Sequence, residues 1–147
     1  MRNEKQKRLE FSSVILAIII AITGFTYYLV QAQDKTLFAK KQLELRNLAT
    51  LTFNYSLSEG STPKNPSRRN SWCEVDAYYG KKRCLGELER DGYITALPIS
   101  PDENPYYYKY ERGVIYVGTP IPNGYILKSV DSCIGNNNEV WWCYKIR

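Results

Sequence analysis

The segment RLEFSSVILAIIIAITGF (residues 8–25) begins with charged residues and then becomes entirely apolar. Residues 11–30 are twenty residues without a charged side chain. An α-helix needs roughly 20 predominantly apolar residues to cross the hydrocarbon core of a membrane. We therefore predict a transmembrane helix over residues 11–30, and the organisation of the rest of the chain follows from it.

Residues 1–10 form a short basic flank of this apolar run. They carry four basic side chains against two acidic ones, namely Arg2, Lys5, Lys7 and Arg8 against Glu4 and Glu10. Such flanks tend to stay in the cytoplasm, so we expect a charged cytoplasmic leader and a domain on the far side of the membrane. The alternative is a secretory signal removed at Ala32, but the apolar region of such a signal is usually about 7–15 residues, shorter than this one.

The residues after the apolar run continue the helix. The segment QDKTLFAKKQLELRNLATLTFNYSL (residues 33–57) contains neither Gly nor Pro. Its apolar residues recur at steps near three, four and seven, which is typical of one face of an amphipathic helix: Phe38, Leu45, Leu48, Ala49 and Tyr55. The charged residues Lys40, Lys41, Glu44 and Arg46 mostly fall elsewhere. One helix over residues 11–57 is predicted, with residues 11–30 in lipid and residues 31–57 on a domain; Gly24 allows a bend or a close helix contact.

Four cysteines follow the helix: Cys73, Cys84, Cys133 and Cys143. An even number of cysteines in an exported domain indicates two disulfides, and four cysteines permit three pairings. We favour Cys73–Cys84 and Cys133–Cys143, because each closes a short local loop. A zinc site is disfavoured because the close Cys-x-x-Cys pairs of structural zinc sites do not occur.

Residues 58–147 have the composition of a small sheet domain. The segment GSTPKNPSRRNS (residues 60–71) is a loop, and CLGELERDGYI (residues 84–94) predicts a short helix that ends at Gly92 with Leu85 and Leu88 inward. Strands are predicted at residues 106–110, 114–118, 125–130 and 139–146, and DSCIGNNN (residues 131–138) is predicted as a turn. We therefore expect an α+β fold, in which the long N-terminal helix covers one face of an antiparallel sheet of three or four strands.

Catalysis is not expected. The chain contains no histidine, which is the commonest general base, and shows no nucleophile motif or paired-carboxylate motif. The balance of 20 Lys and Arg against 15 Asp and Glu is mildly basic and does not demand a nucleic-acid partner.

Two loops carry oxygen ligands of the kind that calcium prefers. They supply Asp102, Glu103 and Asn104 in one case, and Asp131, Asn136, Asn137, Asn138 and Glu139 in the other. Neither loop matches a spaced calcium-loop pattern, and Asn and Asp favour turns. We therefore expect turns and no cofactor, with calcium as the open alternative.

The order of these segments resembles the type IV pilin and type II secretion pseudopilin superfamily. The most specific local match is LGELERDGYITALPISPDENPYYYKY (residues 85–110), with Leu88, Gly92-Tyr93, Leu97-Pro98, Pro101-Asp102 and the aromatic run of residues 106–110. The loop from Cys133 to Cys143 resembles the disulfide-closed C-terminal region of many pilins. The resemblance implies an inner-membrane location with the domain periplasmic or extracellular, assembly with other pilin or pseudopilin subunits, and contact with an inner-membrane assembly platform.

The N-terminus departs from the superfamily at two positions. Prepilin peptidase usually cuts between a glycine and a phenylalanine; Phe11 occupies the second position, but Glu10 replaces the glycine. Family members usually carry a glutamate four residues after the phenylalanine, where this chain has Ile15. That carboxylate is thought to pair with the N-terminal amine of a neighbouring subunit, since a charge in lipid is costly unless paired. Its absence suits a subunit at the tip or initiation position of a filament.

The resemblance therefore predicts a minor pilin-like or pseudopilin-like subunit that packs in a filament through Phe11, Ile15, Ile18, Ile22 and Gly24. One alternative is an uncleaved single-pass membrane protein with a scaffold or sensor domain.

A narrower alternative is a DNA-binding uptake pilin, with contacts from Arg68, Arg69, Lys81, Lys82, Arg83, Lys145 and Arg147. Aromatic residues could add base stacking, although strand alternation places either Trp141 or Trp142 in the core. The tyrosines of residues 106–108 likewise fall on both faces of a strand, and we expect one face on the helix and the other toward a neighbouring subunit.

Overall fold

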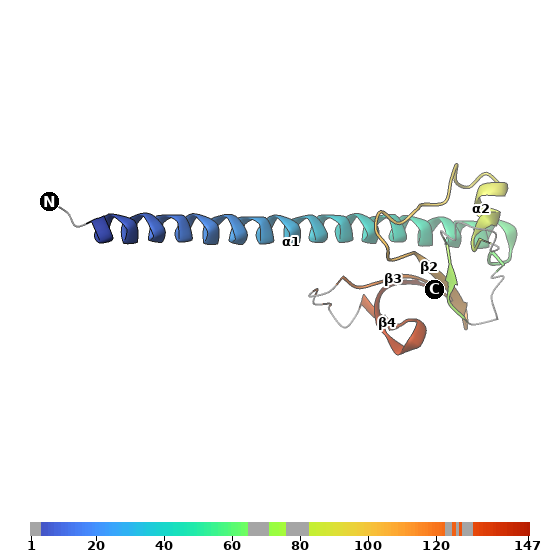
Figure 1. Cartoon of the computed structure of the whole chain (residues 1–147). Coiled ribbons are helices and arrows are strands. Elements are labelled where there is room, and N and C mark those ends of the chain that lie inside the picture. Colours follow the sequence, from blue (N-terminus) through green and yellow to red (C-terminus); the bar gives the residue numbers. More distant parts are fainter. Residues whose placement is uncertain (1–3, 65–70, 76–82, 123–124, 126, 128–130) are drawn as a thin grey trace. The chain divides into compact units, whose positions relative to one another are not determined.

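The computed structural model describes residues 4–64, 71–75, 83–122, 125, 127 and 131–147 (Figure 1). Its compact units are Met1–Leu37 and Phe38–Arg147. The helices and strands, in chain order, are α1 (Glu4–Glu59), β1 (Cys73–Glu74), α2 (Gly86–Arg90), β2 (Tyr107–Glu111), β3 (Val114–Pro120), β4 (Ser132–Ile134), the 3-10 helix η2 (Asn136–Asn138) and β5 (Val140–Ile146).

Helix α1 is 56 residues long and extends the predicted helix at both ends. It ends before Gly60, whose φ of +66° lies in the left-handed region that glycine adopts without steric cost. The boundary between the two units falls after Leu37, inside the segment predicted to be the amphipathic half. Its physical basis is Phe38, which is the first buried side chain among the described residues of α1.

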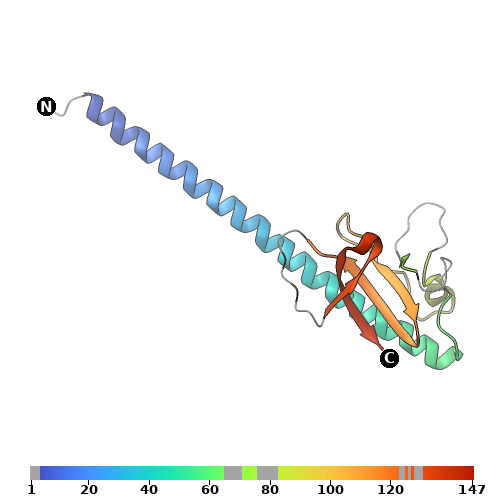
Figure 2. The ribbon, with the colours of Figure 1, turned by 90° about the horizontal axis from the view of Figure 1, so that it is seen from below.

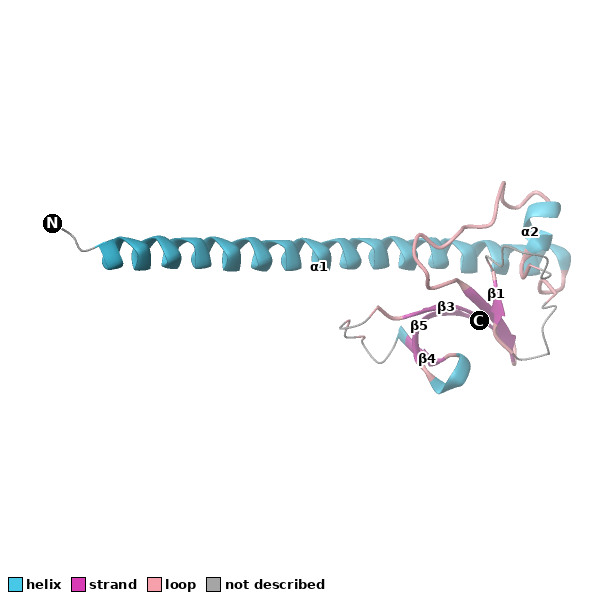
Figure 3. Ribbon diagram, viewed as in Figure 1, coloured by secondary structure: helices cyan, strands magenta, loops and turns pink. Residues whose placement is uncertain are grey.

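The described strands form one antiparallel sheet with the order β1-β2-β3-β5-β4 (Figure 3). Every pair of neighbouring strands is antiparallel, so the predicted α+β class is confirmed. The predicted hairpin is present as β2 and β3, and its turn is made by Arg112 and Gly113, both with positive φ. The strand predicted at the C-terminus is β5.

The strand prediction is wrong at β4 and at β1, and at residues 125–130 the structure tests it only in part. A strand was expected at residues 125–130, but Tyr125 and Leu127 lie outside any strand, and residues 126 and 128–130 lie outside the described residues. The strand β4 instead lies in the segment predicted to be a turn, where Cys133 pairs in register with Trp141. The two-residue strand β1 was not predicted at all; it pairs with β2 through Cys73 and Tyr108.

The part of α1 that belongs to the second unit lies along one face of the sheet (Figures 1 and 2). The core between them contains helix residues and alternate strand residues: Phe38, Leu45, Leu48, Tyr55, Tyr106, Tyr108, Ile115, Val117 and Trp142. Helix α2 adds Leu88, and Leu85 precedes it; both are buried, as predicted. Burial also raises the pKa of Tyr108, whose hydroxyl donates to the carbonyl of Pro63 over 3.5 Å.

Two disulfides hold the domain. They join Cys73 to Cys84 and Cys133 to Cys143, the two short-loop pairs favoured from the sequence. The Cα–Cα distances are 6.0 Å and 5.8 Å, which lie within the usual range for disulfides. The first bridge ties the loop before α2 to the sheet edge, and the second ties β4 to β5.

The sheet face opposite α1 carries a second aromatic layer. The ring of Trp141 lies 4.4 Å from that of Tyr107 and 5.4 Å from that of Trp72, centroid to centroid. The indole N–H of Trp72 donates to the carbonyl of Ile134 over 3.0 Å. Beneath these rings, a side chain at Gly118 would meet Cys143 Sγ at 2.8 Å, so the close packing requires glycine there.

Candidate functional site

The first candidate site is the apolar part of α1. Every side chain from residue 11 to residue 37 is exposed in the structure. Among the described residues, α1 is the helix whose length and composition suffice to cross a membrane. Residues 11–30 span about 30 Å at 1.5 Å per residue, which matches a hydrocarbon core of about 30 Å. The structure therefore has a segment compatible with a single-pass membrane anchor.

The two threonine hydroxyl groups in this segment have acceptors within the helix. Thr23 Oγ1 donates to the carbonyl of Ile19 over 2.9 Å, and Thr26 Oγ1 donates to the carbonyl of Thr23 over 3.0 Å. Both hydroxyl groups can therefore enter lipid without an unsatisfied donor. Tyr27 and Tyr28 stand near the end of the run, as aromatic residues do at membrane–water interfaces.

The residues predicted for assembly separate into two faces of the helix. The steps of four, three and four residues between Phe11, Ile15, Ile18 and Ile22 place them on one face. All four side chains are exposed; Phe11 is 70% exposed and Ile15 43%. Gly24 lies on the opposite face by the same geometry, and a side chain there would meet open space beyond the local helix backbone. Glu10 belongs to α1, but its side chain lies outside the described residues.

The residues predicted to contact DNA are only partly described. Arg68, Arg69, Lys81 and Lys82 lie outside the described residues. Arg83 is paired with Glu89 over 3.6 Å, and Lys145 Nζ donates to the carbonyl of Ser132 over 3.2 Å. Arg147 is exposed at the end of the chain.

The expectation that one of the two tryptophans lies in the core is confirmed by Trp142, and Trp141 is buried as well. Trp141 is 2% exposed and Trp142 1%. Alternation along β5 puts them on opposite sheet faces, and on the second face the ring of Trp72 packs on Trp141. Tyr107, on the face expected to meet a neighbouring subunit, packs on Trp141. Neither indole ring is free to stack on a base, and DNA contact stays a prediction.

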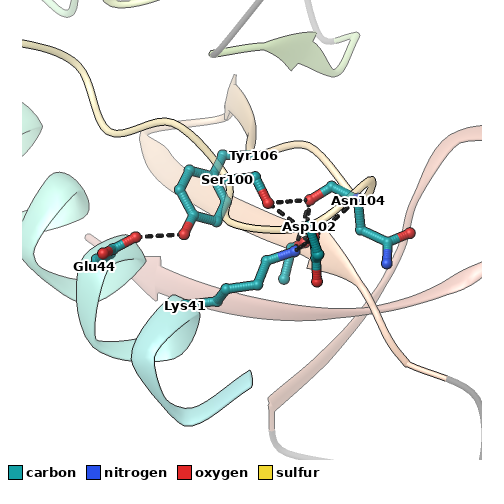
Figure 4. A network of polar contacts seen from close by, with 7 residues as sticks. Lys41, Glu44, Ser100, Asp102, Asn104 and Tyr106 are labelled. Carbon is teal, nitrogen blue, oxygen red and sulfur yellow. Dashed lines mark hydrogen bonds and ion pairs between the residues drawn. The ribbon is translucent and has the colours of Figure 1, made fainter. Parts of the chain in front are cut away.

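The second candidate site is a polar cluster between α1 and the loop before β2 (Figure 4). Lys41 is 1% exposed, and its Nζ donates to Asp102 Oδ1 over 2.7 Å and to the carbonyl of Asn104 over 2.6 Å. Ser100 Oγ lies within hydrogen-bond distance of the same two oxygens, at 2.9 Å and 2.7 Å. One turn further along α1, Glu44 accepts a hydrogen bond from the hydroxyl of Tyr106.

The sequence did not single out Lys41, which was grouped with charged residues that mostly leave the buried face. Its spacing nevertheless indicates the buried face, because Lys41 lies three residues after Phe38 and four before Leu45. A lysine on the buried face requires a partner, and Asp102 provides it. Burial by itself would raise the pKa of Asp102, but the hydrogen bonds from Lys41, the Asn104 N–H and Ser100 lower it below the ordinary value.

The two loops considered for calcium have other partners. Asp102 Oδ1 accepts hydrogen bonds from Lys41, Ser100 and the backbone N–H of Asn104. In the other loop, Glu139 Oε2 accepts the indole N–H of Trp141 over 3.3 Å, and the neighbouring asparagines form η2. Within the described part of the chain, no group of three His, Cys, Asp or Glu side chains is placed to hold a metal ion.

Comparisons of the chain with protein-family models, curated proteins and solved structures give no match.

Proposed function

We propose that this protein is a minor pilin-like or pseudopilin-like structural subunit of a type IV pilus or a type II secretion filament. In this proposal it catalyses no reaction. It assembles through the apolar part of α1 and presents the domain of residues 38–147 outside the membrane. The supporting observation is the change of burial along one helix: residues 11–37 are exposed, and from Phe38 onward the helix buries a face against a disulfide-bonded sheet domain.

Assembly in this proposal uses the face that carries Phe11, Ile15, Ile18 and Ile22. Within a bilayer, helices associate through van der Waals packing rather than through the hydrophobic effect, because lipid tails are as apolar as the side chains. Branched and aromatic side chains on one face can provide such packing against a neighbouring helix. With Ile15 in place of a carboxylate, the subunit needs no charged partner above it, which suits the tip or initiation position.

The processing of the N-terminus tests the filament proposal against its alternative. The mass and the N-terminal residue would be measured on the protein isolated from its own cells. A chain that begins at Phe11, particularly with a methylated amine, is the result expected for a processed subunit. A chain that still begins at Met1 contradicts processing at this position.

The alternative is an uncleaved single-pass protein whose outer domain is a scaffold or sensor. Glu10 favours it, because a glutamate stands where prepilin peptidase usually meets a glycine. This alternative predicts an intact Met1 and no other subunit beside the protein in detergent-solubilised membranes. Recovery of the protein in a complex with a second protein that carries an apolar N-terminal helix would contradict it.

A further inference from the structure

The turn from Ser100 to Asn104 gathers oxygen atoms toward one point. The backbone N–H of Asn104 donates to Asp102 Oδ1 over 2.9 Å, which closes the turn on the aspartate side chain. Ser100 Oγ lies near both Asp102 Oδ1 and the Asn104 carbonyl, and Thr119 Oγ1 donates to that carbonyl over 3.4 Å. One carboxylate oxygen and one carbonyl oxygen therefore converge, and hydroxyl groups hold them in place.

A cationic group occupies the point of convergence, and it comes from the helix. Lys41 Nζ lies 2.7 Å from Asp102 Oδ1 and 2.6 Å from the Asn104 carbonyl, and the lysine is 1% exposed (Figure 4). Carboxylate and carbonyl oxygens are the ligands that hard cations take in proteins, and a lysine ammonium is a compact, strongly hydrated point charge. Here the oxygens of the turn replace the water of the ammonium group.

We propose that the Ser100–Asn104 turn is a cation-binding loop whose cation is the ammonium group of Lys41. The ammonium group of the lysine occupies the position of a bound cation, and its side chain attaches the loop to α1. Two consequences follow. The wild-type domain gains no stability from added calcium, and removal of the lysine side chain leaves a site for a free monovalent cation of the ammonium class. Neither consequence depends on filament assembly.

Chemical rescue of a truncated lysine tests this proposal. In Lys41→Ala, n-propylammonium has the atoms that the substitution removes, namely three carbons and the ammonium nitrogen. Thermal unfolding of the full chain in detergent would be followed by tryptophan fluorescence; Trp72, Trp141 and Trp142 all lie in the second unit. Each variant is refolded with the salt present, so that a variant that needs the cation in order to fold also gives a result.

We expect Lys41→Ala to lower the unfolding midpoint by roughly 10 °C or more, because it leaves Asp102 without its buried partner. Propylammonium chloride should restore part of that loss, whereas tetramethylammonium chloride at the same ionic strength should not, because it has no N–H to donate. Lys41→Met fills the space without a charge and should remain destabilised in both salts. Lys40→Ala is the matched control, since Lys40 is exposed, and it should change little in any salt.

Three results would overturn the proposal. One is equal recovery of Lys41→Ala in the two salts, which would show a general salt effect. Another is Lys41→Met with wild-type stability, which would show that the site needs only an apolar filler. The third is a wild-type midpoint that rises with calcium chloride and falls again with EGTA, because the loop would then still take a free ion.

Discussion

Residues 11–30 and residues 38–59 belong to the same helix but differ in the burial of their side chains. In the first segment isoleucine, leucine, valine and phenylalanine occur around the whole helix, and all side chains are exposed. In the second segment buried side chains recur on one face only, from Phe38 to Tyr55. A helix that is apolar all round needs an apolar surrounding, whereas a one-sided helix needs a single partner surface. The two segments therefore suit different surroundings, and the spacing of their apolar side chains makes the difference.

Substitution of two lysines into the first segment should produce the largest effect, a loss of membrane association. Ile18→Lys with Ile22→Lys places charges where the insertion cost is about 3 kcal/mol each, so we expect loss of the carbonate-resistant membrane fraction. Leu43→Lys is the matched control, because Leu43 is exposed in the second segment and its substitution should leave the membrane fraction unchanged. If the double variant remains in the membrane, the assignment of residues 11–30 to lipid is wrong.

The second segment should respond to the loss of apolar volume at its buried positions. Leu45 is fully buried, and Leu45→Ala should lower the free energy of unfolding by about 2–5 kcal/mol. Leu43→Ala, two residues away and 61% exposed, should change it by less than about 0.5 kcal/mol. Denaturant unfolding followed by tryptophan fluorescence measures both, and similar values for the two variants would contradict the one-sided burial.

Loss of a disulfide should affect the domain and leave the anchor intact. The double variant Cys73→Ser, Cys84→Ser removes the bridge between β1 and the residues before α2. We expect a loss of about 2–4 kcal/mol in the free energy of unfolding, with the membrane fraction at the wild-type level. A reduced membrane fraction would show that the two segments do not act independently.

The smallest expected effect is the loss, at acid pH, of the stability that Asp102 contributes. The folded pKa of Asp102 lies below its ordinary value of 3.8. Its contribution to stability is therefore fully present above the unfolded pKa and is lost as the pH falls through the folded pKa. We expect the difference in unfolding midpoint between wild type and Asp102→Asn to be constant near pH 6–7 and to shrink below about pH 4. A difference that grows on acidification would contradict the pairing with Lys41.

The sequence was sufficient for the long helix, for the hairpin of β2 and β3, and for β5, because each has a clear period or turn signal. It failed at β4, because Ser, Gly and Asn in residues 131–138 favour a turn by composition. The strand forms there because Cys133 pairs with Trp141 in β5 and is bridged to Cys143. Such pairing is set by the tertiary fold, which a local pattern does not contain.

The candidate sites were predictable to different degrees. The exposed apolar segment followed from the absence of charge over residues 11–30. The polar cluster did not, because Lys41 and Asp102 are 61 residues apart and meet only when the loop before β2 packs on α1. The burial of Trp141 was missed for a related reason: alternation gives the sheet face, but not the rings of Trp72 and Tyr107 that pack there.

Photo-crosslinking from the apolar face of α1 tests the central claim most directly. A photoreactive residue would replace Phe11, Ile15, Ile18 or Ile22 in turn, in the cells that make the protein, and the adducts would be identified by mass spectrometry. Assembly through this face predicts adducts with a second copy of the chain or with another protein that carries an apolar N-terminal helix. Lipid adducts alone at all four positions would contradict it and leave a membrane anchor that does not assemble.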